Sequence, residues 1–304
     1  MNPRRLGAAA ICAAAALWGL DGVVLTPRLH NLPVLVVVFL LHAVPFLLMQ
    51  PALAKSYSRL RHLDVGQWLT LAAVAATGGV LGTLAIVKAL FLVDFNQLSV
   101  VVLLQKFQPV FAVGLAAVML REKLTRGFLS WAALAVLGGY LLTFGWSLPD
   151  FVGGAKETEA AVMALLAAAA FGSATVFGKK LLAALDFGDA TFARYGLTTL
   201  LTAVLLAATG TRLSLEVITR QEWLTIAIIA ITTGSGAIFL YYFGLQRVPA
   251  RVAAICELCL PLSAVAFDYF VNRSVLSPLQ IVGALLMIGA ITRVTTLPPA
   301  RGPG

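Results

Sequence analysis

Long apolar runs separated by short polar segments are the main feature of the hydropathy pattern. A membrane-spanning helix needs about 20 mostly apolar residues, and ten runs approach or reach that length. The runs are continuously apolar, whereas the strands of a membrane barrel alternate over segments of about ten residues. The pattern therefore predicts ten transmembrane helices, at about residues 6–26, 32–50, 67–89, 96–119, 126–146, 160–181, 188–208, 223–245, 250–270 and 278–296.

The chain also repeats itself after about 150 residues. Residues 67–71 (QWLTL) resemble 222–226 (EWLTI), which lie 155 positions further on. AALWGLDGVV matches AAAFGSATVF and QKFQPVFAV matches ELCLPLSAV, with offsets of 153 and 152. Each copy holds five predicted spans, an odd number, so the second copy inserts upside down relative to the first. Secondary transporters use such inverted repeats and place the substrate site near the midplane between the halves.

These observations predict an all-α membrane protein with ten transmembrane helices, arranged as two inverted five-helix repeats around a central cavity. We expect the first repeat in residues 1–147 and the second in 159–297. An outer linker should occupy 148–158. The ending 298–304, which contains two prolines and the letters RGPG, is expected to be a short cytoplasmic tail.

Composition excludes a soluble domain. Hydrophobic residues make up 60% of the chain and charged residues only 12%, and the mean hydropathy is +0.94. Soluble domains carry about 25% charged residues. The net charge of +9 does not indicate a nucleic-acid partner, because the charges cluster in short loops between apolar runs.

The distribution of Lys and Arg predicts the orientation. With both termini in the cytoplasm, 14 of the 22 Lys and Arg residues fall in cytoplasmic segments and 5 in outer segments, and 3 lie within spans. Positive residues favour cytoplasmic loops. We therefore expect a multi-pass protein of the bacterial inner membrane with both termini cytoplasmic, as a monomer or homodimer.

The sequence indicates no catalytic, metal or cofactor site. Cys256 and Cys259 form a C-x-x-C on an apolar helix, with no second pair, so we interpret them and Cys12 as packing residues. The three histidines are scattered. The chain contains no nucleotide-binding P-loop, no G-x-S-x-G and no H-E-x-x-H motif. We expect a protein that is not an enzyme and needs no cofactor.

Residues 103–142 resemble the end of an EamA-type repeat in the drug/metabolite transporter superfamily. AALWG and AAAFG resemble the opening of the first helix of such a repeat. The second copy departs from the pattern, because Ser274 stands where the first copy has an acidic residue. The resemblance at 103–142 is carried by a mid-helix proline, an acidic–basic pair at the helix end and two glycines in the next helix: Pro109, Glu122, Lys123, Gly138 and Gly139.

The resemblance implies a central cavity lined by the first four helices of each repeat, with the fifth helices at the periphery. It also implies transport of a small metabolite. Many bacterial members of the superfamily carry amino acids and their relatives, and organellar members carry sugar phosphates or nucleotide sugars.

Polar residues deep in the spans are the candidate site. A charge at the bilayer centre costs about 2.5–3.5 kcal/mol even on the insertion scale, so such residues are functional candidates. Lys106 lies near the midplane of its span, and Gln105, Gln108 and Pro109 are its neighbours. We expect this group to line the cavity. The alternative is that Lys106 only neutralises a carboxylate for structural reasons.

Two carboxylates are candidates for proton coupling. Glu257 stands four residues before Pro261, as Gln105 stands four before Pro109, so the inverted symmetry brings Glu257 and Gln105 to equivalent positions. Burial disfavours the charged form of a carboxyl group, which suits a proton carrier. The alternative is a static ion pair with Lys106. Asp21 is the second candidate, as a gate or proton acceptor, unless water from the outer mouth solvates it.

Aromatic and hydroxyl side chains complete the predicted substrate site. Trp18 shares a helix face with Asp21, and Arg194 could bind a carboxylate unless it reaches the cytoplasmic interface. Tyr241 and Ser173 could supply hydrogen bonds, as could Tyr242 and Thr175.

Together these features predict a secondary transporter of a small polar metabolite, most plausibly an amino acid or similar zwitterion that is exported or exchanged with protons. Lys106 would bind the anionic end of the substrate, and Glu257 or Asp21 the cationic end. An exchanger of anionic or phosphorylated metabolites, using Lys106 and Arg194, is the alternative. A membrane scaffold or lipid-handling subunit would not need charges at this depth. The expected partners are a small molecule, the lipid bilayer and protons, with no nucleic acid.

Overall fold

The computed structural model describes residues 2–93, 101, 104–146 and 154–297. Within these ranges the chain forms helices and no strands. Nine helical segments of the described chain are long and apolar enough to cross a membrane, and one further apolar helix is shorter. The shorter one belongs to the span predicted at 96–119, of which residues 96–100 and 102–103 lie outside the described residues. The protein is therefore an all-α membrane protein with the expected succession of helices.

The first repeat begins with α1 (Pro3–Leu20), which continues into a π-helical turn, η1 (Asp21–Leu25), and a short 3-10 turn, η2 (Thr26–Leu29). The helices that follow are α2 (Val34–Leu53), α3 (Ser56–Leu60), α4 (Val65–Val74), α5 (Gly82–Leu92), α7 (Gln108–Met119) and α8 (Arg126–Phe144). A π-helical turn, η3 (Ala75–Leu81), joins α4 to α5 in one span. The short helix α3 was not predicted.

The second repeat follows the same order. Its helices are α9 (Ala155–Leu181), α10 (Phe187–Thr209), α11 (Arg220–Ile229), α12 (Ser235–Arg247), α13 (Ala250–Cys256), α14 (Cys259–Asn272) and α15 (Pro278–Thr296), with a 3-10 turn η4 (Leu215–Val217) before α11. A π-helical turn, η5 (Ala230–Gly234), joins α11 to α12. α9 begins inside the segment 148–158 that was predicted as a linker, because Glu157 in its first turn and a run of alanines favour a helix.

Equivalent helices of the two repeats begin with equivalent N-terminal capping residues. Asp64 caps α4 with Gln67 in a capping box, and Thr219 caps α11 with Glu222 in the same way, 155 positions later. In each box the side chains satisfy N–H groups that the first helical turn leaves free. The π-helical turns η3 and η5 also begin 155 positions apart, at residues 75 and 230. The duplicated sequence therefore dictates a duplicated backbone.

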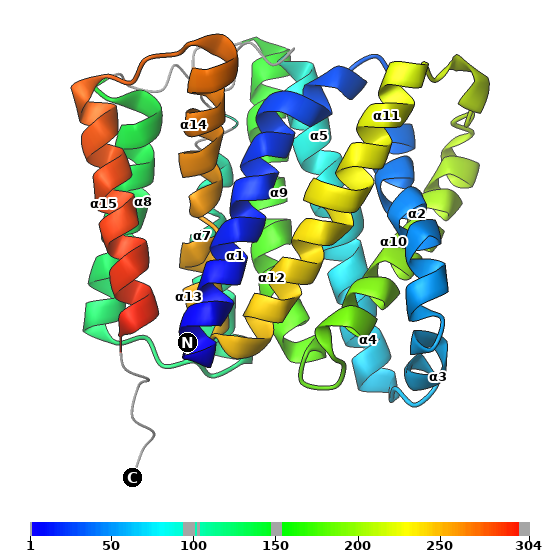
Figure 1. The fold of residues 1–304 in the computed structure, drawn as a ribbon, viewed down its shortest axis with the longest axis horizontal. Helices are drawn as coiled ribbons and strands as arrows, with labels where there is room; N and C mark the ends of the chain where they lie inside the picture. Colours follow the sequence, from blue (N-terminus) through cyan, green and yellow to red (C-terminus); the bar gives the residue numbers. More distant parts are fainter. Residues whose placement is uncertain (1, 94–100, 102–103, 147–153, 298–304) are drawn as a thin grey trace.

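Both ends of the described chain lie at the same end of the bundle (Figure 1). The Arg4 guanidinium donates a hydrogen bond of 2.7 Å to the carbonyl of Leu297. We call this the terminal end. α8 and α15, the fifth helices of the two repeats, pack on each other at one edge of the bundle. This edge position leaves the other helices to surround the centre.

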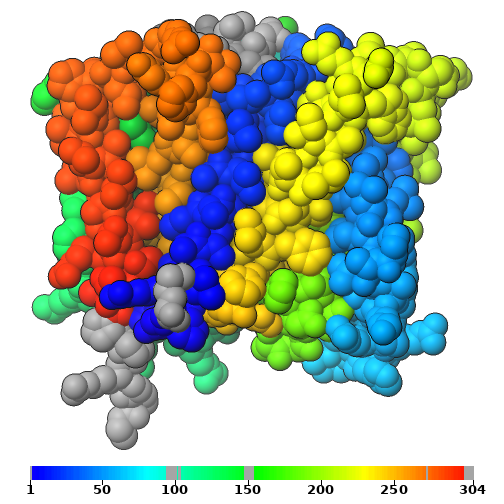
Figure 2. Space-filling view, viewed as in Figure 1, coloured from blue at the N-terminus to red at the C-terminus, as the bar shows by residue number. Residues whose placement is uncertain are grey.

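The surface of the bundle is apolar, as a lipid-facing surface must be. Figure 2 shows one broad face, on which α15, α14, α1, the single span of α11 and α12, and α2 lie side by side. Large apolar side chains are exposed along these helices, including Leu47, Leu224, Ile231 and Leu285. Contiguous apolar surface of this extent is rare on soluble proteins. The chain is a multi-pass membrane protein.

Two glycines bring the repeats into backbone contact. A Cβ atom added at Gly19 on α1 would lie 2.8 Å from the carbonyl oxygen of Leu260 on α14. A Cβ atom added at Gly172 on α9 would lie 2.8 Å from the carbonyl oxygen of Gln108 on α7. These are equivalent contacts, because the offsets of the two pairs are 153 and 152. Each first helix thus packs on the fourth helix of the opposite repeat.

We expect Gly172→Ala to destabilise the protein by about 1–3 kcal/mol, because the added methyl group overpacks a contact between two backbones. Chemical or thermal unfolding of the purified protein in detergent measures the change. Gly114→Ala on α7 is the matched control, since a Cβ atom there meets nothing within 4 Å. Equal stability of the Gly172→Ala and Gly114→Ala proteins would contradict the backbone contact.

Candidate functional site

Both fourth helices are interrupted by a short turn partway along their length. In the second repeat, α13 ends at Cys256 and α14 begins at Cys259, with a turn at Glu257 and Leu258. In the first repeat, α7 begins at Gln108 after a turn at Lys106. Pro109 and Pro261 follow these turns and cannot donate the backbone hydrogen bond that an unbroken helix needs. Interrupted helices of this kind form the substrate and ion sites of many transporters.

The two interruptions face one another across a small cavity. Its volume is about 40 Å³. Residues of the two repeats line it at equivalent positions: Gln105, Lys106, Gln108 and Pro109 from the first, and Glu257, Leu258, Leu260 and Pro261 from the second. The cavity therefore lies on the axis that relates the repeats.

Glu257 is the centre of a hydrogen-bond network. Its side chain is 7% exposed. Tyr241 donates to Oε1 of Glu257 at 2.7 Å, and Thr175 donates to the same oxygen at 3.1 Å. The Gln108 amide donates to Oε2. These donors come from α12, α9 and α7, so the carboxylate joins helices of both repeats. Hydrogen bonds to a charged group contribute about 1.5–3 kcal/mol each, which offsets part of the cost of its burial.

The amine of Lys106 bonds to a different part of the protein from Glu257. Its amine donates a hydrogen bond of 2.9 Å to the carbonyl of Gly139 on α8. The same carbonyl accepts a hydrogen bond from Thr143. The amine of Lys106 thus points toward the edge helix α8, although the residue lines the cavity. The alternative interpretation, a static ion pair between Lys106 and Glu257, is wrong in this structure, because each group bonds to other partners.

Arg194 is buried next to this network. Its side chain is 8% exposed and does not extend to the interface. The guanidinium donates to the hydroxyl of Tyr242 at 3.3 Å and also lies over that ring. Gly78 on η3 leaves room for it, since a Cβ atom there would lie 3.0 Å from Nη2. In the described part of the chain no carboxylate forms an ion pair with Arg194.

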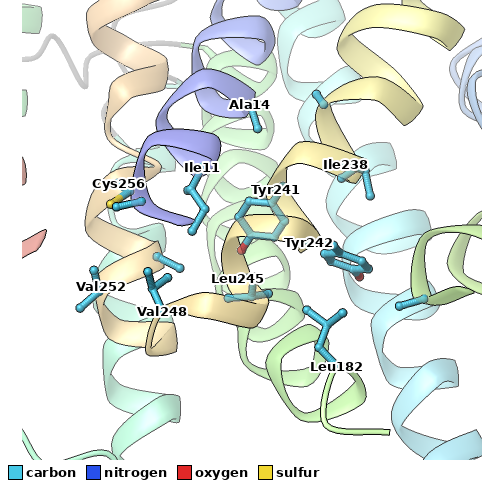
Figure 3. Packing of buried hydrophobic residues seen from close by; sticks show 14 of the residues in the cluster. Ile11, Ala14, Leu182, Ile238, Tyr241, Tyr242, Leu245, Val248, Val252 and Cys256 are labelled. Atoms are coloured by element: carbon cyan, nitrogen blue, oxygen red, sulfur yellow. The ribbon is translucent and has the colours of Figure 1, made fainter. Parts of the chain in front are cut away.

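Two adjacent tyrosines on α12 contact the two buried charged groups, Glu257 and Arg194. Tyr241 bonds to Glu257 and Tyr242 bonds to Arg194, and their ring centroids lie 5.9 Å apart. Figure 3 shows the two rings leaving α12 toward different sides, with Ile11 of α1 and Cys256 of α13 on the side of Tyr241. Trp18 on α1 packs on Tyr241 with 5.3 Å between ring centroids. The site therefore offers aromatic faces as well as hydrogen-bonding groups.

The remaining predicted residues lie outside the Glu257 network. Ser173 donates its hydroxyl to Ala169 in its own helix, and Gln105 is half-buried at the cavity wall. Asp21 lies further along α1, where η1 begins. Its Oδ1 atom is inaccessible to solvent in this structure.

Thr175 bonds to Glu257 and Tyr242 bonds to Arg194, although neither was singled out for the predicted substrate site. Thr175 is three residues after Gly172 and so shares the helix face that contacts α7. That spacing is the signal that could have favoured Thr175 over Ser173. The role of Tyr242 depends on the buried position of Arg194, which the sequence left open.

The cysteines are closer together than their sequence positions suggest. The thiol of Cys12 on α1 lies within hydrogen-bonding reach of Cys256 and Cys259. Among the described residues, no three His, Cys, Asp or Glu side chains are arranged to hold a metal ion. The cluster packs α1 on the interrupted helix beside Glu257.

Comparison with known proteins agrees with this architecture. The EamA-like transporter family matches residues 5–144 and 158–296, which are the two repeats. The riboflavin transporter ImpX of Fusobacterium nucleatum is 50% identical over 292 residues, 96% of this chain and 98% of the relative. A solved crystal structure with 17% identity covers 95% of this chain and 96% of its own, with a TM-score of 0.74, and has the same fold.

These matches decide the class of protein. The family match covers nearly the whole chain and the named relative is a transporter, so the protein is a transporter and not an enzyme. The relationship with the drug/metabolite transporter superfamily, which the sequence suggested, is confirmed. The two inverted repeats, with their interrupted fourth helices and polar centre, agree with this relationship. The chain belongs to the EamA-like transporter family.

Proposed function

We propose that this protein carries riboflavin, or a flavin of closely similar structure, across the membrane by alternating access. The observation that carries the proposal is the 50% identity with a riboflavin transporter over nearly the full length of both chains. The match covers 96% of the chain and so extends over most of both repeats.

The chemistry of the site supports a flavin. Riboflavin has a flat, uncharged aromatic ring system with a hydrogen-bonding edge, and a chain of hydroxyl groups. Trp18 and Tyr241 offer aromatic faces on which such a ring can stack. Gln105 and Gln108 can pair with groups that both donate and accept hydrogen bonds.

An amino acid fits the observed contacts less well. A zwitterion needs two opposite charges that are free to bind it, but the Lys106 amine bonds to Gly139 and Glu257 is surrounded by three donors. Amino-acid transport was the leading prediction from the sequence and is not supported by the relative. An anionic substrate would use Arg194, whose one bonded partner among the described residues is a tyrosine hydroxyl.

Substrate entry requires the site to open. Pockets that bind drug-sized ligands have volumes of about 300–1,000 Å³, whereas the cavity between the interruptions holds about 40 Å³. The terminal end of the bundle is also closed. There Glu122, after α7, accepts hydrogen bonds from the backbone N–H groups of Ala250 and Arg251 and from the Arg251 guanidinium. Release of this contact would separate the fourth helices of the two repeats.

We expect the purified protein to bind riboflavin, and Trp18→Leu to weaken binding about threefold to tenfold, because a lost aromatic pair costs about 0.5–1.5 kcal/mol. Quenching of riboflavin fluorescence measures the affinity. Trp68→Leu is the matched control, since Trp68 is exposed on α4 and should leave binding unchanged.

Lys106→Met distinguishes the substrate classes. An uncharged flavin should keep its affinity for this variant, whereas a carboxylate or phosphate bound by the amine should lose about tenfold to a hundredfold. Binding of amino acids or phosphorylated metabolites without any binding of riboflavin would contradict the proposed substrate.

We further propose that Glu257 exchanges a proton during transport. It is the buried carboxylate on the axis between the repeats, and its hydrogen-bond donors come from three other helices. Glu257→Gln should abolish accumulation driven by a pH gradient while riboflavin exchange at equal pH continues. Vesicles containing the purified protein measure both processes. Glu159→Gln, which removes a half-exposed carboxylate paired with Lys88, is the control. Gradient-driven uptake by the Glu257→Gln protein would exclude Glu257 as the proton carrier.

The terminal end is proposed to face the cytoplasm of a bacterial inner membrane. The excess of Lys and Arg on this side, 14 against 5, supports the orientation. In a protein without native cysteines, Asn2→Cys should react with an impermeant maleimide only after lysis. Glu157→Cys near the start of α9 should react in intact cells. The opposite labelling pattern would reverse the orientation.

A further inference from the structure

A second polar site lies on α1, one helical turn beyond Trp18. Asp21 begins the π-helical turn η1. Its Oδ1 atom is inaccessible to solvent and has no hydrogen-bond partner. No Lys or Arg of the described chain forms an ion pair with it. A carboxylate without a counter-charge is costly inside a membrane, so a bound cation or a proton must balance it.

Two threonines face this carboxylate. Thr26 follows η1 on the same chain segment, and Thr233 lies in η5, the π-helical turn of the opposite repeat. Thr233 is 2% exposed, and its hydroxyl has no hydrogen bond of normal geometry. Since η5 packs against α1, oxygens of both repeats converge on Asp21.

We propose that Asp21, Thr26 and Thr233 bind a sodium ion. One carboxylate balances one positive charge, and hydroxyl oxygens are hard ligands suited to such an ion. Calcium and magnesium prefer sites with more carboxylates, so the single carboxylate favours a monovalent ion. Backbone carbonyls or water would complete the coordination shell.

The unpartnered oxygens favour a metal ion over a proton. A protonated carboxyl is a hydrogen-bond donor and needs an acceptor, and Oδ1 of Asp21 forms no hydrogen bond of normal geometry. A cation instead needs oxygens whose lone pairs are not already in use, and both Oδ1 of Asp21 and the Thr233 hydroxyl meet that condition. π-helical turns often mark functional sites in helices, and two of them meet here.

The position suggests what the ion does. Asp21 and Trp18 are three residues apart and share one face of α1. Occupancy of the ion site ties η1 of the first repeat to η5 of the second, and thereby holds α1 in place beside Tyr241. This coupling to transport rests on the proposed function, whereas binding of the ion does not.

Direct binding of ²²Na⁺ to the purified protein, in potassium buffer and without any flavin, tests the site. We expect saturable binding that Asp21→Asn abolishes and that Thr233→Val weakens at least tenfold. Thr232→Val is the matched control, because the neighbouring Thr232 is exposed and its hydroxyl bonds to Ile228 in its own helix. Thr233→Ser keeps the hydroxyl group and should bind sodium nearly as well as the unchanged protein.

Two results would overturn the proposal: no saturable sodium binding to the unchanged protein, or equal binding by the Asp21→Asn protein. Size-exclusion profiles and unfolding temperatures show whether each variant is folded. Because sodium binding is measured without substrate, its failure is distinguishable from failure of the proposed flavin transport. Sodium binding by a protein that does not bind riboflavin would leave the ion site intact.

Discussion

Each interrupted helix is held by a glycine on the first helix of the opposite repeat. Gly19 touches the backbone at Leu260, and Gly172 touches the backbone at Gln108. A side chain at either glycine would push the helices apart, because backbone atoms cannot yield as a flexible side chain can. These contacts place the backbone beside each interruption against the first helix of the opposite repeat. The polar groups at the interruptions can then meet on the axis between the repeats.

Those polar groups are buried, so each of them needs a hydrogen-bond partner within the protein. A polar group in the membrane interior must find partners within the protein, since no water is available to bind it. Glu257 finds three donors, Lys106 finds the carbonyl of Gly139, and Arg194 finds Tyr242. The charges are thus satisfied separately and do not neutralise one another directly. The proposed flavin substrate, which is uncharged, would exchange hydrogen bonds with this network without removing a counter-ion.

The two repeats share a backbone architecture but differ in their functional side chains. Capping boxes, π-helical turns and prolines recur at matched positions, and each serves the backbone. The functional groups do not recur: Glu257 stands opposite Gln105, Glu122 opposite Ser274, and Asp21 opposite Ala174. The contact of Glu122 with the start of α13 closes the terminal end, and Ser274 offers no carboxylate for an equivalent contact at the other end. The carboxylate of the terminal-end contact therefore has no counterpart at position 274.

The sequence by itself determined the helices, their order, the inverted repeats and the family, because length, apolar character, caps and prolines act within single segments. It also indicated which polar residues lie deep in the membrane, since depth follows from position along a helix. Only the tertiary structure decided which of them meet. Thr175 rather than Ser173 reaches Glu257, Lys106 turns toward Gly139, and Thr233 faces Asp21. Those pairings depend on helix rotation and on close approach at glycines, which are set by packing between segments distant in the chain.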